Sequence, residues 1–401
     1  MPILKGVSLG AEPSFDVAWE GEVVTSVTLS RSNRPARLLL PAFVDTHIHL
    51  DKVLIWDDCN DHDGTLAGAI GAIHERKRRY TVEDVRGRAR QVIESAVLHG
   101  TTRLRSHVDI DTIGGLTGLE GVMAAAADCA NIAEVQTIAF PQEGIIRDPG
   151  AWELMEAAIK MGADIVGGMP HWELTEADQL EHVRLCFALA ERHDRDVDMH
   201  VDETDDGSIR TLEMVADETI RRGWRGRVSA GHVCSLAAAD DGYSARVIAK
   251  CVAAGITIVA NPVTNLIIQG RGDHGLIRRG STRINEFRSA GVNLAFGQDC
   301  VNDGFYPFGR GDMLEVALIS AHSAHLSTRA DIAYALEAVT QAPARAWRLT
   351  DYGIRPGGRA DFSLYRAATW PEALRLQRPP EQVWFRGREV ARSSLEQTLL
   401  S

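Results

Sequence analysis

Short apolar runs alternate with segments of helical periodicity through most of the chain. The spacing predicts a helix over residues 84–99 and a strand over 101–109, and the same order recurs before the strand that ends at His200. Repeated helix-then-strand units are typical of a parallel sheet, and eight of them close into a (β/α)8 barrel of the α/β class. An open doubly wound sheet is the alternative, but no glycine-rich phosphate loop follows the first strand. Further helices are predicted over 119–130, 151–161, 177–193, 211–223, 245–254 and 285–290, and further strands over 135–140, 164–168 and 257–260.

The two ends of the chain have a different pattern from the middle. Residues 23–29 and 362–365 alternate apolar and polar positions. Such alternation is typical of short antiparallel strands with one buried face. We therefore predict a small β-sandwich built from both termini, residues 1–38 and 350–401, and a metal-dependent barrel over residues 39–349.

Ligand-type residues lie at the ends of several predicted strands. His47 and His49 follow a long apolar run, and at positions i and i+2 of a strand their imidazoles point to the same side. His200, His232 and Asp299 end three further apolar runs. Because strand ends meet at one rim of a barrel, these groups are expected to form one site there. Taken alone, the first two histidines are equally consistent with surface residues leaving a strand.

Three imidazoles and one carboxylate suit a single divalent metal with an open position for water. Such a metal lowers the pKa of its water from about 16 to near 7. Hydrolysis then needs a carboxylic acid to carry a proton to the leaving group, and Glu203 lies three residues after His200. Either His232 or Asp299 can orient the water through a hydrogen bond. The fourth strand offers no lysine to bridge a second ion, so we predict one metal, and the ligand set accepts zinc or iron.

Composition restricts the partners. The length of 401 residues fits one barrel with a small appended unit. A net charge of −12, spread along the chain, argues against a nucleic acid polymer or an anionic membrane. No apolar run approaches a membrane span and the N-terminus lacks a signal-peptide pattern, so a cytoplasmic location is expected. Six scattered cysteines without a Cys-x-x-Cys pair exclude a zinc ribbon and argue against a disulfide scaffold. The oligomeric state stays open, with a homo-oligomer as one alternative.

Short motifs that include the strand-end residues are spread over nearly the whole predicted barrel. In chain order they are Phe43-Val44-Asp45-Thr46-His47-Ile48-His49-Leu50-Asp51, Gly64-Thr65-Leu66, Ser106-His107-Val108-Asp109, Ala139-Phe140-Pro141-Gln142-Glu143-Gly144, His200-Val201-Asp202-Glu203-Thr204-Asp205-Asp206, Ala260-Asn261-Pro262, Gln269-Gly270-Arg271, Tyr306-Pro307 and Asp351-Tyr352-Gly353-Ile354. Together they resemble the amidohydrolase superfamily, and most closely its cytosine deaminase branch.

The resemblance implies roles for individual residues. The metal ligands would be His47, His49, His200 and Asp299. Glu203 would move the proton and His232 would contact the hydrolytic water. Gln142 would read the pyrimidine edge, because one amide supplies both a donor and an acceptor for the ring nitrogen and the carbonyl. Phe140 and Leu66 would supply apolar walls.

Two departures from the cytosine-specific pattern concern the substrate. Cys300 follows the expected metal ligand Asp299 where that pattern has a second aspartate, and Phe305 replaces a tryptophan. A carboxylate over the ring would resist an added methyl by bulk and by desolvation, whereas this corner is more apolar. The pair therefore favours a 5-substituted cytosine such as 5-methylcytosine, with neutral drift as the alternative. Gln298 also replaces a histidine of the family, without a predicted consequence.

These observations predict a cytosine deaminase-like aminohydrolase that acts on C–N bonds of cyclic amidines. Its partner would be a small heterocyclic base, deaminated by hydrolysis. One alternative is another cyclic amidine, an aminotriazine or a creatinine-like ring, because the same metal and acid would serve any ring with an exocyclic amine. Another is a non-catalytic scaffold of the same fold, against which the complete set of expected ligands argues.

Overall fold

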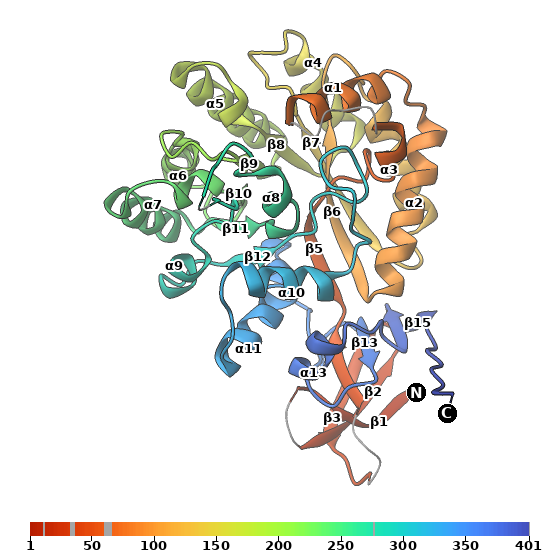
Figure 1. Ribbon diagram of the computed structural model, residues 1–401. Helices are drawn as coiled ribbons and strands as arrows, with labels where there is room; N and C mark the ends of the chain where they lie inside the picture. Colours follow the sequence, from red (N-terminus) through yellow and green to blue (C-terminus); the bar gives the residue numbers. More distant parts are fainter. Residues whose placement is uncertain (11–12, 33–36, 60–65, 276, 401) are drawn as a thin grey trace.

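The computed structural model describes the chain outside residues 11–12, 33–36, 60–65, 276 and 401. Eight parallel strands form one sheet in chain order, and helices surround it (Figure 1). The strands are β5 (Phe43–Ile48), β6 (Thr101–Asp109), β7 (Glu134–Phe140), β8 (Ile165–Gly168), β9 (Asp196–Val201), β10 (Val228–His232), β11 (Thr257–Ala260) and β12 (Leu294–Phe296).

The first and last of these strands meet just beyond the end of β12. Ile48 forms an isolated parallel bridge with Asp299. The Asp299 amide donates to the His47 carbonyl over 2.7 Å, and the His49 amide donates to the Asp299 carbonyl over 3.2 Å. The sheet therefore closes on itself, and the predicted (β/α)8 barrel is confirmed.

The helices predicted from periodicity are present, with ends that differ by a few residues. Thr81 and Thr175 cap α2 and α5, because each hydroxyl accepts a hydrogen bond from the amide three residues later. Periodicity does not predict α10, whose sequence is apolar at most positions. The helices are α1 (Leu66–Lys77), α2 (Val82–Leu98), α3 (Thr117–Asp128), α4 (Ala151–Met161), α5 (Glu176–His193), α6 (Thr211–Arg222), α7 (Asp241–Ala254), α8 (Pro262–Ile268), α9 (Ile284–Ser289), α10 (Met313–Ser323), α11 (Arg329–Glu337), α12 (Gln341–Ala346) and α13 (Trp370–Leu376), with 3-10 turns at Trp56–Cys59, Pro170–Trp172 and Cys234–Ala237.

Both termini contribute to a second sheet, which lies beside the barrel (Figure 1). Its seven strands are hydrogen-bonded in one continuous order, β15-β14-β13-β4-β1-β2-β3. It has its own apolar cluster, in which the Trp19 and Phe362 rings lie 5.1 Å apart. The strands are β1 (Ile3–Ser8), β2 (Ser14–Glu20), β3 (Val23–Leu29), β4 (Arg37–Pro41), β13 (Phe362–Tyr365), β14 (Gln382–Phe385) and β15 (Arg388–Arg392). The predicted β unit from both termini is thus present, while its boundaries at residues 38 and 350 stay a prediction.

Two further features follow from the fold. All six cysteines are buried and unpaired, as expected for small core side chains. None of the helices in the described part of the chain has the length and apolar character needed to span a bilayer.

Candidate active site

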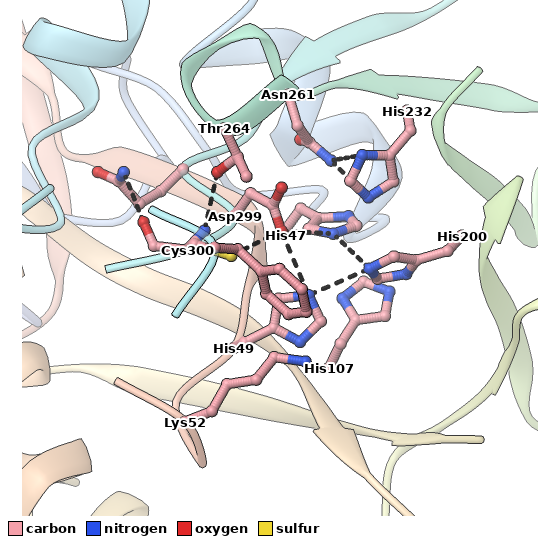
Figure 2. Close-up of polar contacts among 12 residues, drawn as sticks. His47, His49, Lys52, His107, His200, His232, Asn261, Thr264, Asp299 and Cys300 are labelled. Carbon is pink, nitrogen blue, oxygen red and sulfur yellow. Dashed lines mark hydrogen bonds and ion pairs between the residues drawn. The ribbon is translucent and has the colours of Figure 1, made fainter. Parts of the chain in front are cut away.

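Four side chains from three places in the barrel converge at one rim (Figure 2). His47 and His49 come from the end of β5, His200 from β9 and Asp299 from the residues after β12. The Nε2 atom of His200 lies 3.3 Å from Nε2 of His47 and 3.1 Å from Nε2 of His49. The Oδ1 atom of Asp299 lies 3.6 and 3.3 Å from the same two nitrogens. The structure thus brings together the four predicted ligands, which we call the metal-ligand cluster.

The spacing of these atoms fits a divalent metal. Bonds of about 2.0 to 2.1 Å around one ion would separate neighbouring ligand atoms by about 3.0 to 3.4 Å. Burial lowers the pKa of His49 to about 4 and holds the pKa of His200 well below its usual range, so both imidazoles are neutral at pH 7. Burial opposes ionisation of Asp299, but His232 and His47 outweigh it and its pKa lies well below the usual range. Neutral imidazoles and an ionised carboxylate are the protonation states that a metal requires.

Strained backbone and two glycines set the geometry of the cluster. Asp299 and His232 have φ of 66° and 70°, in the left-handed region that costs a non-glycine residue of the order of 1–3 kcal/mol. A Cβ at Gly231 would lie 2.8 Å from the His47 ring, and a Cβ at Gly297 would lie 2.7 Å from the His47 Cβ. Only glycine therefore lets the neighbouring strands approach His47 this closely.

Glu203 and His232 lie next to each other beside the cluster. Their Oε1 and Nδ1 atoms are 3.0 Å apart. Asn265 joins them, because its Nδ2 donates to Glu203 over 3.0 Å and its Oδ1 lies 3.2 Å from His232 Nδ1. Asn261 Nδ2 lies 3.3 Å from His232 Nε2 (Figure 2). Asn261 lies in one of the sequence motifs but was assigned no role there, and Asn265 lies outside those motifs, although the i,i+4 spacing at the start of α8 places the two on one helix face.

A cavity opens beside the cluster. Glu203, Gln142, Cys300 and Phe305 lie on its wall, as do His49, His200 and Asp299. Apolar side chains from α1, from the 3-10 turn Pro170–Trp172 and from α8 complete one part of the wall, and they are Ile70, Ile73, Trp172 and Ile268. The cavity thus gives a small molecule access to the cluster and to the predicted proton carrier.

Phe140 and Leu66 are the two residues predicted to supply apolar walls against the substrate. The Phe140 ring is fully buried and stacks on the His200 ring, with centroids 4.1 Å apart. The ring therefore contacts a predicted metal ligand, and its role as an apolar wall against the substrate stays a prediction. The Leu66 side chain lies outside the described residues.

The cavity corner at Cys300 is held by polar contacts of the backbone. The Cys300 amide donates to Thr264 Oγ1 over 3.3 Å (Figure 2). The Cys300 carbonyl accepts from Gln298 Nε2 over 3.2 Å. The Cys300 thiol lies 3.8 Å from Asp299 Oδ1. Gln298, to which the sequence assigned no role, thus fixes the residue after the metal-ligand cluster.

Lys52 and His107 are two further buried residues that sequence reasoning left without a role. Lys52 lies on the cavity wall three residues after His49. The His107 ring stacks on His47 with centroids 4.1 Å apart, and its Nε2 lies 3.4 Å from Asp198 Oδ1. The available signal was their position at the carboxyl ends of β5 and β6, where barrel enzymes place functional residues.

Comparison with known proteins identifies the family. The amidohydrolase family model matches residues 60–391. The chain is also 32% identical to the pterin deaminase of Rhizobium rhizogenes over 369 residues, which cover 91% of this chain and 83% of that protein. The chain therefore belongs to the amidohydrolase family. The predicted resemblance is confirmed, and so is the prediction of a hydrolase that acts on C–N bonds.

Two solved structures are particularly similar. The 5-methylcytosine deaminase of Klebsiella pneumoniae, liganded with phosphonocytosine, has a TM-score of 0.95 and 33% identity, with 100% of both chains covered. The N-isopropylammelide isopropylaminohydrolase of Burkholderia multivorans has a TM-score of 0.84 and 28% identity, with 97% of this chain and 98% of that chain covered.

Proposed function

We propose that the protein is a metal-dependent deaminase of a free amino-pyrimidine base, and that it favours 5-methylcytosine over cytosine. The observation that carries this proposal is the cavity in which Glu203, Gln142 and Cys300 lie beside the metal-ligand cluster. The likeness to the Klebsiella 5-methylcytosine deaminase supports the same substrate class.

One zinc or iron ion would be held by the metal-ligand cluster. When bound, such an ion supplies a water of lowered pKa as the nucleophile. Burial and the neighbouring Asp299 carboxylate raise the pKa of Glu203 well above its usual range. A protonated Glu203 can therefore give a proton to the leaving group at neutral pH. Asn265 holds the Glu203 carboxyl in place, and His232 would orient the water.

The reaction then proceeds by addition and elimination. Water adds to the ring carbon that bears the amine, the electrons of the ring C=N bond move to the ring nitrogen, and this nitrogen takes up the proton that the water loses. Glu203 next protonates the exocyclic amine, the C–N bond breaks, and ammonia leaves. The remaining hydroxyl gives its proton back to the Glu203 carboxylate and becomes the carbonyl of the product. No oxidant or reductant is consumed.

The substrate preference rests on Cys300 and Phe305. Both lie on the cavity wall, and Cys300 is buried beside Asp299. We place the C5 methyl of the pyrimidine against this corner, where an apolar wall favours a methyl and a carboxylate would disfavour it. Gln142 would hold the opposite edge of the ring.

A screen of free bases for ammonia release tests this proposal. The metal-loaded protein would be incubated with 5-methylcytosine, cytosine, a pterin and an aminotriazine. We expect the highest kcat/KM with 5-methylcytosine and a lower value with cytosine. Faster release from the pterin or the aminotriazine would assign the protein to one of the alternative rings, and no release from any ring would contradict deamination.

A further inference from the structure

Lys52 is a charged side chain buried at the cavity wall, close to the metal-ligand cluster (Figure 2). Its side chain is only 2% exposed. The ammonium nitrogen lies 5.9 Å from the centre of the Phe140 ring and 5.8 Å from the centre of the Phe305 ring. Burial opposes the charge, but the carboxylates of Asp109 and Asp51 outweigh it and raise the pKa of Lys52. The group is therefore a permanent cation facing the cavity.

The hydrogen bonds of Lys52 leave one donor unused. Its Nζ donates to Asp109 Oδ1 over 3.0 Å and to Gln142 Oε1 over 2.8 Å. An ammonium has three N–H groups, and these two oxygens are its hydrogen-bond acceptors among the described residues. One donor is thus free for a ligand in the cavity, whose wall includes Lys52.

Lys52 also determines which hydrogen-bonding group of Gln142 is available to a ligand. A lysine only donates, so the Gln142 oxygen faces Lys52 and its Nε2 faces the other way, 3.2 Å from Met169 Sδ. An amide oxygen that already accepts from a cation is a weakened acceptor for a second donor. The edge of the cavity formed by Lys52 and Gln142 therefore presents mainly donors.

Lys52 is not the only cation beside its buried carboxylate. Lys77 Nζ also lies 2.7 Å from Asp109 Oδ2. Burying a second ammonium at this place carries a large desolvation cost. A ligand that accepts a hydrogen bond in the cavity would use the donor of Lys52 that the carboxylate and the amide leave free.

We propose that Lys52 is a substrate-binding residue that donates a hydrogen bond to a ring oxo oxygen of the heterocycle and thereby selects oxo-substituted rings. The inference rests on the proposed function, which makes the ligand an amino-substituted heterocycle. When water adds to the amine-bearing carbon, the electrons displaced from the C=N bond spread to a conjugated oxo oxygen. The Lys52 ammonium stabilises this developing charge, so it contributes to turnover as well as to binding.

The experiment compares two rings that differ in the oxo group, cytosine and 4-aminopyrimidine, in the parent and in Lys52→Met. Ammonia release gives kcat/KM, and calorimetry in a Glu203→Gln background gives the affinity for each ring without turnover. A hydrogen bond to a charged donor is worth about 10- to 100-fold. We expect the parent to prefer cytosine, and Lys52→Met to lower kcat/KM and affinity for cytosine by about that factor while 4-aminopyrimidine is unaffected.

Lys77→Met is the matched control. It removes the other ammonium from Asp109 but has no hydrogen bond to Gln142, so it should keep the preference for cytosine. If Lys52→Met does not fold, Lys52→Gln replaces it, because the amide keeps a polar group of similar reach without the charge. A preference for cytosine that survives in a folded Lys52 variant, or that is absent in the parent, would overturn the proposal.

The two readouts separate this inference from the proposed function. If the parent releases no ammonia from any base but its Glu203→Gln form binds cytosine more tightly than 4-aminopyrimidine, and Lys52→Met removes that difference, the deaminase proposal fails and the role of Lys52 stands. If ammonia is released and both rings respond equally to Lys52→Met, the deaminase proposal stands and the role of Lys52 fails.

Discussion

Two buried polar clusters lie at the same rim of the barrel. They differ in whether their own side chains supply the opposite charges that the buried polar groups need. In the metal-ligand cluster, ring nitrogens of three histidines face one another at 3.1 to 3.3 Å, with one carboxylate beside them. The second, which we call the lysine–aspartate cluster, consists of Lys52, Lys77, Asp109 and Asp111. There each ammonium lies 2.6 to 3.0 Å from a carboxylate oxygen.

The comparison shows how a site for a ligand can be told from a structural ion cluster of similar burial. Nitrogens that face one another need a cation between them, which the metal-ligand cluster does not contain among its own side chains. The lysine–aspartate cluster supplies its own cations, and Lys52 in addition has an unused donor at the cavity wall. We therefore expect changes in the first cluster to abolish function, whereas removal of the Lys77 ammonium from the second should mainly lower stability.

The largest effect is expected for a missing ligand. Asp299→Ala or His200→Ala should lose bound metal and all measurable turnover, because each deletes one of the four converging donors. Metal content by mass spectrometry and ammonia release would be measured on the same sample. His193→Ala, at the end of the outer helix α5, serves as the control and should keep both. Full metal occupancy in the ligand variants would break the proposed site.

Loss of the proton carrier should separate metal binding from turnover. Glu203→Gln should keep its metal but lose about 10²- to 10⁴-fold in kcat, because an amide cannot move the proton. The amide keeps the size of the side chain and can still contact Asn265. Activity within about tenfold of the parent, at equal metal content, would remove Glu203 from the mechanism.

In the lysine–aspartate cluster we expect a loss of stability. Lys77→Met leaves the buried Asp111 carboxylate without its cation and Asp109 with Lys52 alone, which should lower the free energy of unfolding by about 3–5 kcal/mol. Urea denaturation measures this free energy of unfolding. The control is the next residue, Arg78, whose ion pair with Glu75 is exposed, so that Arg78→Met should cost less than about 1 kcal/mol. Equal losses of unfolding free energy in Lys77→Met and Arg78→Met would mean that burial does not determine how much these ion pairs contribute to stability.

The smallest effect is expected for substrate preference. If Cys300 contacts the C5 methyl, Cys300→Asp should shift the kcat/KM ratio from 5-methylcytosine towards cytosine by roughly 10- to 200-fold, the value of one methyl in an apolar pocket. Both rates should be compared at saturating metal, so that a disturbed Asp299 is not mistaken for altered specificity. An unchanged ratio in a fully metallated variant would show that Cys300 does not face the ring.

The sequence predicts the parts of this site that depend on local pattern. Periodicity locates the strands, and His47 and His49 share one side of β5 because strand side chains alternate. Lys52 escapes such reasoning, because a lysine four residues after the end of a strand is most often solvated. Its partners Asp109 and Gln142 lie 57 and 90 positions further along the chain, and only barrel closure brings them to it.

The direction in which a buried aromatic ring points also cannot be predicted from the local sequence pattern. Phe140 ends β7, so an aromatic side chain at the rim is predicted correctly. That it stacks on His200 of β9 depends on how β7, β8 and β9 pair in the barrel, which the local sequence does not show. The pairing of β4 with β13 likewise joins residues more than 300 positions apart, and the apolar run before His47 does not indicate that its first part belongs to the second sheet.

The bridge between Ile48 and Asp299 gives the barrel a seam, and three of the four predicted ligands lie on it. His47, His49 and Asp299 exchange backbone hydrogen bonds across this seam while their side chains converge on one point. An ion bound there would fasten the first strand of the barrel to its last, so its binding free energy would also oppose local opening. Amide hydrogen exchange at His49 and Asp299 should therefore slow on metal loading more than exchange between β8 and β9, where no predicted ligand pair spans the strands.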